Sequence, residues 1–241
     1  MSAGAPDPKS FVKVRAILPR QPFPLNATRH AFTTDRLILR PLVAEDVEPM
    51  HVMCTQPEVM RVSIQGRPDR DLAETQLRLD RFLSPNDAKT FNCAVILRET
   101  GEFIGIGGCH SWASAFGWPE IGYMLRKEFW GKGLGSELAK GFVAMWEELP
   151  RAEIEMTVDP RTVEGVDFED GDAAPVVVEG QLNAVTADYN IASQTILKKA
   201  GFEHFITWTT EDARPDMPKG TMIHLPTFRY TFGGNLRAGA K

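Results

Sequence analysis

Apolar residues along the chain follow two spacings that predict different elements. Residues 36–40 alternate apolar and charged side chains, as a half-buried strand does. The apolar runs 91–97 and 103–109 flank a Thr-Gly turn, which indicates a hairpin. By contrast, residues 71–82 and 136–148 repeat apolar side chains at helical spacing. The chain is therefore expected to contain both strands and amphipathic helices.

The two ends of the chain show less of this pattern. Residues 1–31 hold five prolines among polar residues, so they are predicted to form an extension without its own core. Within it, residues 11–14 have the composition of an added edge strand. Near the other end, residues 204–208 and 228–232 are predicted as two final strands on either side of a Pro-rich loop.

A strongly acidic insertion occupies about residues 151–181. The segment that best fits the next strand of the domain is 182–187, which follows this insertion. The flanks of the insertion, 154–158 and 176–178, can pair as a hairpin around the acidic tip; alternatively, 154–158 is itself the next strand. Because such a long loop is unusual in a compact domain, the insertion is either a functional flap or a disordered segment.

A glycine-rich turn joins the strand at 120–125 to the helix at 136–148. Gly131, Gly133 and Gly135 lack the Cβ atoms that would keep a ligand away from the backbone. The helix that follows points its free N–H groups at the same place, so the turn is suited to a phosphate group. Taken alone, the turn is equally well explained as a tight connection with no ligand.

Composition and charge argue against several classes of protein. The chain has 241 residues and 43% hydrophobic content, enough for a sizeable core, and its net charge of −5 disfavours a nucleic-acid partner. Cys54, Cys93 and Cys109 are far apart and accompany no His cluster, so we expect buried thiols rather than disulfides or a metal site. No apolar run reaches the ~20 residues of a membrane span and the N-terminus has no secretory h-region, so we expect a cytoplasmic protein with no membrane partner.

Three motifs resemble the GNAT superfamily of N-acetyltransferases and occur in the family's order. The glycine turn is similar to the acyl-CoA pyrophosphate loop, Gln/Arg-x-x-Gly-x-Gly/Ala, with Trp130 at the first position. A Trp there is typical of the Rim-type branch, the ribosomal-protein N-terminal acetyltransferase-like group. Residues 190–202 resemble that family's Asn-x-x-Ser helix, which closes in Gly-Phe, and residues 34–46 resemble its first strand and helix.

The resemblance implies an α+β fold of the GNAT type, with a mixed, mostly antiparallel central sheet of about seven strands and flanking helices. It implies one acetyltransferase domain at 32–235, interrupted by the insertion at 151–181 and followed by a tail at 236–241. Acetyl-CoA would be the co-substrate, and no metal is implied. An amine acceptor would be the second partner.

The same resemblance assigns contacts to this co-substrate. The strand would hold the pantetheine arm by strand-like pairing if it diverges from its neighbour, and the turn would offer backbone donors to the pyrophosphate. Asn190 matches a pantetheine contact and is also suited to cap its helix. The cofactor-binding residues implied are Tyr123, Met124, Leu125, Trp130, Gly131, Lys132, Gly133, Leu134, Gly135, Ser136 and Asn190.

Two residues match catalytic positions of the family. An ammonium group must lose a proton before it attacks, and Glu120 matches a position that often serves as the base through water. Glu120 is equally consistent with an anchor for the substrate ammonium. Ser193 matches the residue that meets the CoA sulfur in Rim-type members, whereas the Tyr that other members place four residues later is Leu197 here. His110 lies after a glycine-rich strand, near where the family places acceptor contacts.

Two functions fit these residues. The first is an acetyl-CoA-dependent N-acetyltransferase that acts on a protein N-terminus or a small-molecule amine, and the presence of both Glu120 and Ser193 favours it. The alternative is a non-catalytic acyl-CoA-binding or interaction protein that uses the acidic insertion as its contact surface. The acceptor loops are expected at 59–70, 111–119 and 212–218, and edge strands at the termini would be compatible with a homodimer.

Overall fold

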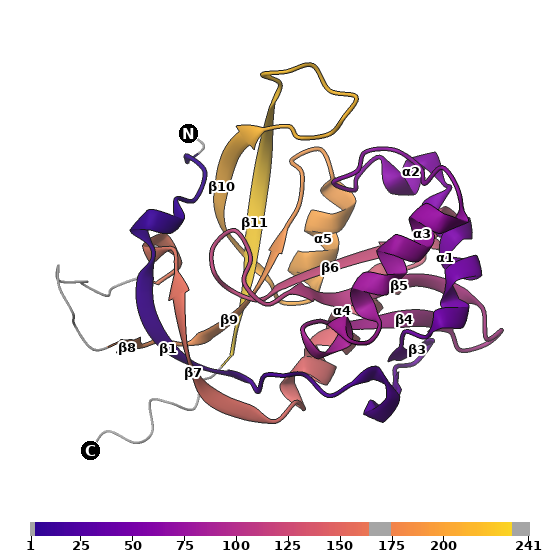
Figure 1. The fold of residues 1–241 in the computed structure, drawn as a ribbon, viewed down its shortest axis with the longest axis horizontal. Helices are drawn as coiled ribbons and strands as arrows, with labels where there is room; N and C mark the ends of the chain where they lie inside the picture. The colour runs from indigo at the N-terminus through magenta and orange to yellow at the C-terminus, as the bar shows by residue number, and fades with distance from the viewer. Residues whose placement is uncertain (1–2, 164–174, 233–241) are drawn as a thin grey trace.

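The main sheet has eight strands. The computed structural model describes residues 3–163 and 175–232, and its strand order is β10-β11-β9-β6-β5-β4-β3-β2 (Figure 1). Neighbouring strands are antiparallel except β6 and β9, which are parallel. The predicted mixed, mostly antiparallel sheet is therefore confirmed. Its strands are β2 (Phe32–Thr33), β3 (Leu37–Pro41), β4 (Phe91–Leu97), β5 (Phe103–Ser111), β6 (Glu120–Leu125), β9 (Gly180–Val185), β10 (Glu203–Glu211) and β11 (Met222–Phe232).

Three helices cover one face of the β3–β5 half of this sheet. They are α1 (Val47–Cys54), α2 (Pro57–Met60) and α3 (Leu72–Leu79). Met50 of α1 and Leu79 of α3 are fully buried and share a core with Ile96 of β4 and Ile106 of β5. The predicted helix at 71–82 is therefore confirmed as α3 and the 3₁₀ turn Asp80–Phe82 that follows it.

The other two α-helices cover the opposite face. α4 (Leu134–Glu147) follows the glycine turn, and α5 (Ile191–Lys199) follows β9. Trp146 of α4 and Leu197 of α5 are buried in one core with Ile121 of β6 and Leu182 of β9. Because side chains alternate along a strand, this packing fixes which residues of β6 and β9 point away from α4 and α5.

A second sheet combines the N-terminal extension with the insertion. Its order is β7-β1-β8, with β1 (Val12–Pro19) antiparallel to β7 (Arg151–Val158) and parallel to β8 (Val176–Val177). The expected edge strand at 11–14 is thus the central strand of this sheet. The flanks of the insertion pair with β1 rather than with each other, so the predicted hairpin between them is wrong.

The strand that follows α4 in the main sheet is β9. It pairs with β6 on one side and with β11 on the other. The prediction of 182–187 as this strand is confirmed within two residues, and the alternative at 154–158 is wrong, because β7 belongs to the second sheet. The acidic tip at 164–172 and the tail at 236–241 lie outside the described residues.

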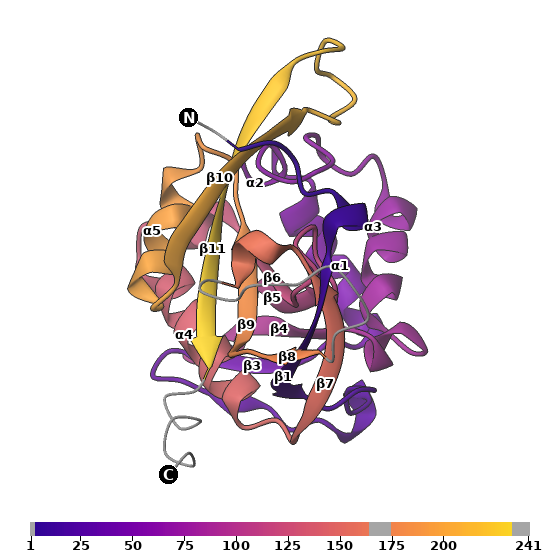
Figure 2. The same cartoon turned by 90° about the vertical axis from the view of Figure 1, so that its left-hand side faces the viewer.

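The second sheet packs against the β9–β11 side of the molecule. Val14 and Leu18 of β1 are buried in a core with Trp118 and with Trp208 of β10. Figure 2 shows β1, β7 and β8 on the near side of the molecule, beside β9. The extension therefore shares a core with the rest of the chain. In the described ranges, no helix has the length and apolar character required to cross a membrane.

The three cysteines are free and buried, as predicted. Burial raises the pKa of the Cys54 and Cys93 thiols to about 12 and raises that of Cys109 as well. Because the thiolate is the reactive form, all three should react slowly with Ellman's reagent at pH 8 in the native protein and rapidly after denaturation. Fast modification of one thiol in the folded protein would contradict this burial.

Candidate active site

Strands β6 and β9 separate almost as soon as they meet. Their parallel pairing consists of one residue pair, Glu120 with Asn183, next to a 2.7 Å hydrogen bond from the Asn183 N–H to the Pro119 carbonyl. On its other edge β9 pairs with β11 from Gly180 to Val185. A fork therefore opens between β6 and β9 beyond Glu120, which is the divergence that strand-like pairing with a pantetheine arm requires.

The glycine turn at the end of β6 needs its glycines for two different reasons. Gly131 and Gly133 have φ values of 71° and 79°, which side-chain-bearing residues rarely adopt. Gly135 lies inside α4, where an added Cβ would come within 2.6 Å of the Ile196 side chain of α5. The first two glycines thus shape the turn, whereas Gly135 allows α4 and α5 to pack closely.

Arg36 holds this turn in place. Its Nη1 donates to the Lys132 carbonyl at 2.9 Å, and its guanidinium pairs with Glu137 of α4 at 2.7 Å. Thr34 also donates to Glu137, at 2.7 Å. Burial opposes ionisation of Glu137, but the hydrogen bonds from Thr34 and Arg36 keep its pKa below the ordinary value. These contacts between Arg36 and the turn were not predicted, although Arg36 lies in the motif at residues 34–46.

The side chains of Trp130 and Lys132 in the turn contact other residues of the protein. The Trp130 indole donates to the Leu125 carbonyl at 2.8 Å and so closes the end of β6. The Lys132 ammonium lies 5.3 Å from the centre of the Phe129 ring, within the range of a cation–π contact. Both side chains stabilise the turn itself, and the turn's backbone remains the part suited to bind an anion.

Ser193, Asn190 and Tyr123 meet at the start of α5. The Asn190 side chain accepts from the Ser193 N–H at 3.1 Å and thereby caps the helix. The Tyr123 hydroxyl lies 2.9 Å from the Ser193 hydroxyl, and either can donate. Burial raises the pKa of Tyr123 to about 12, so the phenol remains protonated at neutral pH. The sequence predicted all three residues but not this hydroxyl pair.

Glu120 lies on the opposite face of β6. Ile121 and Tyr123 face the core under α4 and α5, so alternation places Glu120 and Gly122 on the other side. The His110 Nε2 is 3.5 Å from the Glu120 Oε1, and an added Cβ at Gly122 would come within 3.1 Å of the His110 ring. Glu120 and Ser193 therefore lie on opposite faces of the sheet beside the fork, so a group that reaches both must pass through it.

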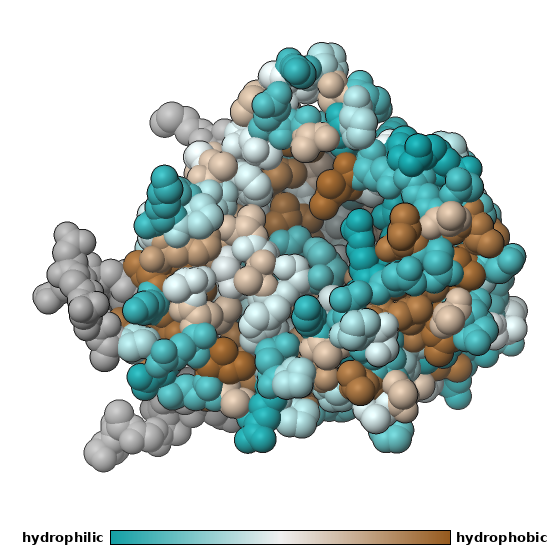
Figure 3. Space-filling model, viewed as in Figure 1, coloured by the Kyte–Doolittle hydropathy of each residue, from teal (hydrophilic) through white to brown (hydrophobic). Residues whose placement is uncertain are grey.

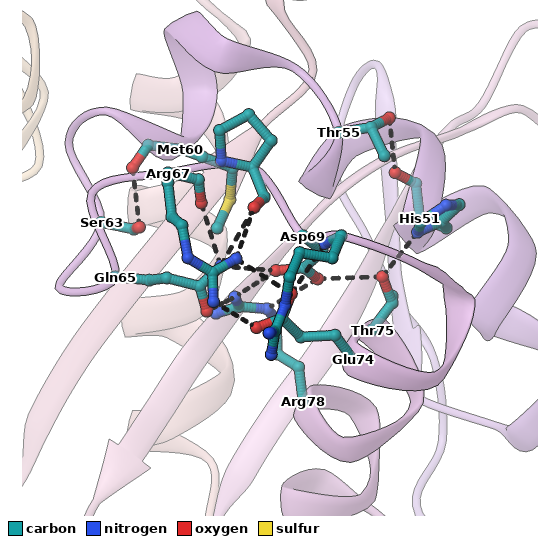
Figure 4. A network of polar contacts seen from close by, with 12 residues as sticks. His51, Thr55, Met60, Ser63, Gln65, Arg67, Asp69, Glu74, Thr75 and Arg78 are labelled. Carbon is teal, nitrogen blue, oxygen red and sulfur yellow. Dashed lines mark hydrogen bonds and ion pairs between the residues drawn. The ribbon is translucent and has the colours of Figure 1, made fainter. Parts of the chain in front are cut away.

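A polar network fixes the first predicted acceptor loop, 59–70. Asp69 is buried and accepts hydrogen bonds from Thr75 at 2.9 Å, Arg78 at 2.8 Å and Gln65 at 3.0 Å (Figure 4). Although burial opposes ionisation, the hydrogen bonds from Arg78 and Thr75 hold the pKa of Asp69 below its ordinary value. His51 Nδ1 extends the network by a 2.7 Å contact with Thr75. The loop is therefore held to α1 and α3.

The other two predicted loops are also held. In loop 111–119, Trp118 is fully buried and donates to Thr162 at 2.8 Å, which fastens this loop to the end of β7. In loop 212–218, Arg214 donates to the Tyr189 hydroxyl at 2.9 Å and to the Arg61 carbonyl at 3.2 Å. Figure 3 shows a surface hollow below the β10–β11 tip, with hydrophobic residues on its walls.

Comparisons with known proteins agree with this geometry. The family described as Acetyltransferase (GNAT) domain matches residues 36–203. The uncharacterized N-acetyltransferase p20 of Bacillus licheniformis is 30% identical over 136 residues, which cover 55% of this chain and 75% of that protein. The family match includes β3, the fork, the glycine turn and α5.

Solved structures share the fold at low sequence identity. The ribosomal-protein-S5-alanine acetyltransferase from Vibrio fischeri has a TM-score of 0.54 and 13% identity, over 84% of this chain and 97% of that one. AAC(6')-Ib, solved with ribostamycin and coenzyme A, has a TM-score of 0.55 and 18% identity, over 86% and 100% of the two chains. The chain therefore belongs to the GNAT acetyltransferase family and is an enzyme that transfers an acetyl group from acetyl-CoA.

Proposed function

We propose that the chain is a Rim-type N-acetyltransferase that acetylates a primary amine, either a protein N-terminus or a small-molecule amine. The observation that carries the proposal is that Glu120 and the Ser193–Tyr123 pair lie on opposite faces of β6, beside one fork. This arrangement puts a proton acceptor on one face of β6 and hydroxyl donors on the other. Amine acetylation requires both, because the amine loses a proton while the departing sulfur gains negative charge.

The residues of this chain fit the co-substrate. The backbone of the turn, from Trp130 to Ser136, would bind the pyrophosphate, since Gly131 and Gly133 shape it and α4 begins there. Tyr123 and Met124 would pair with the pantetheine arm along the free edge of β6. Leu125 contributes less, because its carbonyl already accepts the Trp130 indole. Acetyl-CoA supplies the activated acetyl group as a thioester.

Glu120 and Ser193 would transfer the two protons of the reaction, one from the amine and one to the departing sulfur. Glu120, with its side chain 17% exposed, accepts the proton that the acceptor amine releases. When Tyr123 is the donor of this pair, the Ser193 hydroxyl hydrogen is available for the sulfur. A tyrosine from β6 thus supports Ser193, and it stands in place of the tyrosine that other family members carry where this chain has Leu197. The buried phenol suits this role because it does not ionise near neutral pH.

The two similar solved structures differ in the kind of acceptor that their descriptions name. The Vibrio fischeri protein is described as acting on an alanine of ribosomal protein S5, whereas AAC(6')-Ib was solved with the aminoglycoside ribostamycin. Trp130 in the glycine turn favours the Rim-type branch for this chain. A peptide N-terminus is therefore the first acceptor to test.

The test is a panel of amines with acetyl-CoA. Peptides that begin with Ala or Ser, aminoglycosides and aliphatic amines are each incubated with the enzyme, and free CoA is followed with a thiol reagent. We expect CoA release and a mass gain of one acetyl group with at least one acceptor. Binding of acetyl-CoA without release on any acceptor would instead support the alternative, a non-catalytic acyl-CoA-binding protein.

A further inference from the structure

Asn183 has a fully buried side chain whose polar atoms have no partner. Within residues 3–163 and 175–232, neither its Nδ2 nor its Oδ1 makes a hydrogen bond to the protein. The residue is 0% exposed and forms the single parallel pair with Glu120 at the base of the fork. Leaving a buried polar group unsatisfied costs about 1–3 kcal/mol, so this position is costly unless something else binds the amide.

The Asn183 amide points to the Glu120 side of the sheet. Leu182 and Ala184 face the core under α4 and α5, so the side chain between them faces the other way. Glu120 faces that side as well, and aligned residues of neighbouring strands lie about 4.8 Å apart. A water molecule that hydrogen-bonds to both groups spans a similar distance, because each such bond is about 2.8 Å long.

The surroundings are polar enough to hold water. Gln181, two residues earlier on the same face of β9, has a buried Oε1 that also lacks a partner in the described part of the chain. The ionisable side chains described around Asn183 and Glu120 include His110, 3.5 Å from the carboxylate, and Arg229, which is in register with Asn183 on β11. Arg229 donates to the Thr162 carbonyl at 3.4 Å. Buried water typically satisfies such unpaired amides.

We propose that Asn183 is a positioning residue that holds an ordered water between its amide and the Glu120 carboxylate. This inference rests on the proposed function. An N–H bond of the acceptor ammonium breaks as this water takes the proton, and the water passes one of its own protons to Glu120. The carboxylate becomes a carboxylic acid, the amine becomes neutral, and the water is regenerated. Glu120 then returns the proton to solvent.

The competing explanation is that Asn183 only fills space, and the two explanations differ in their effect on turnover. Replacing an unsatisfied buried amide by an apolar group of similar size is neutral or stabilising. If Asn183 is structural, Asn183→Leu should therefore raise or preserve stability and leave turnover unchanged. If Asn183 holds the water, the same variant should keep its stability but lose turnover.

The experiment compares wild type with Asn183→Leu and Asn183→Ser. Kinetic constants are measured on the best acceptor of the amine panel, together with Tm and the Kd of acetyl-CoA. For Asn183→Leu we expect kcat to fall at least about tenfold, with Tm equal or higher and acetyl-CoA affinity within about twofold. Asn183→Ser, which keeps a donor and an acceptor and leaves room for water, should recover part of kcat. A high-resolution crystal structure should show the water in wild type and not in Asn183→Leu.

Wild-type kcat in Asn183→Leu would overturn the inference. A loss of kcat accompanied by a lower Tm and weaker acetyl-CoA binding would overturn it as well, because that pattern indicates general damage to the fold rather than the loss of one water. If the wild-type enzyme acetylates no amine, the proposed function fails instead. In that case the crystallographic water still decides whether the amide holds water.

Discussion

Replacing Glu120 by Gln is expected to lower kcat/KM for the amine acceptor by about 10²- to 10³-fold, the range typical of a lost general base. The amide keeps the size of the side chain and its contact with His110 but cannot accept the proton. Acetyl-CoA should bind as in wild type, because the glycine turn lies beyond the far end of β6 and Ser193 lies on the opposite face from Glu120. Steady-state kinetics and a direct acetyl-CoA titration measure the two effects separately.

A matched control is Glu148→Gln. Glu148 is an exposed carboxylate at the end of α4, outside the fork, so the variant removes the same charge without touching the proposed site. It should retain wild-type kinetics. If Glu120→Gln instead leaves the rate unchanged across the pH range, Glu120 is not the base and at most anchors the acceptor ammonium.

Replacing Asp69 by Asn is expected to destabilise the folded protein by about 3 kcal/mol at pH 7, since removing one partner of a buried ion pair leaves the other charge unpaired. The side chains of Asp69 and Arg78 are 0% and 17% exposed, and their contact is 2.8 Å. The variant should also raise KM for the acceptor, because the network holds loop 59–70. Denaturant unfolding and acceptor titration measure these effects.

The Asp69 effect should depend on pH. The pKa of Asp69 is lower in the folded protein than in the unfolded chain, so its stabilisation is complete above the unfolded value of about 4 and is lost as the pH falls through the folded value. The stability difference between wild type and Asp69→Asn should therefore shrink below about pH 4. Glu74→Gln, whose partners Arg67 and Arg70 are more exposed, should cost less at pH 7. A difference that does not change with pH would contradict this account.

Local patterns in the sequence were sufficient to predict most of the main sheet. Residues 91–109 fold as the β4–β5 hairpin because two apolar runs flank a Thr-Gly turn, so the two paired strands are close together in the sequence. The glycine turn and the Asn190 cap could also be predicted from the sequence, since Gly131 and Gly133 adopt positive φ and the cap is a hydrogen bond between neighbouring residues. These features depend on neighbouring residues alone.

The second sheet and the contacts at the fork join residues that are far apart in the sequence, so local patterns do not predict them. The strand at 12–19 was predicted only in part, as an edge strand at 11–14, because its partners lie beyond residue 150. Tyr123 was expected to use its backbone, yet its hydroxyl meets Ser193 only because α5 crosses the end of the fork. Asn183 gave no signal in the sequence, since a polar residue in a strand is usually exposed on a sheet face.

The central place of β1 in the second sheet sets an order of events during synthesis on the ribosome. Val12 pairs with Val158 and Pro19 with Arg151. At elongation rates of about 5–20 residues per second, the partner strand leaves the ribosome roughly 7 to 30 s after β1. The apolar side chains of β1, including Val14 and Leu18, stay uncovered for that time. The second sheet therefore cannot form until well after the β4–β5 hairpin of the main sheet has been synthesised.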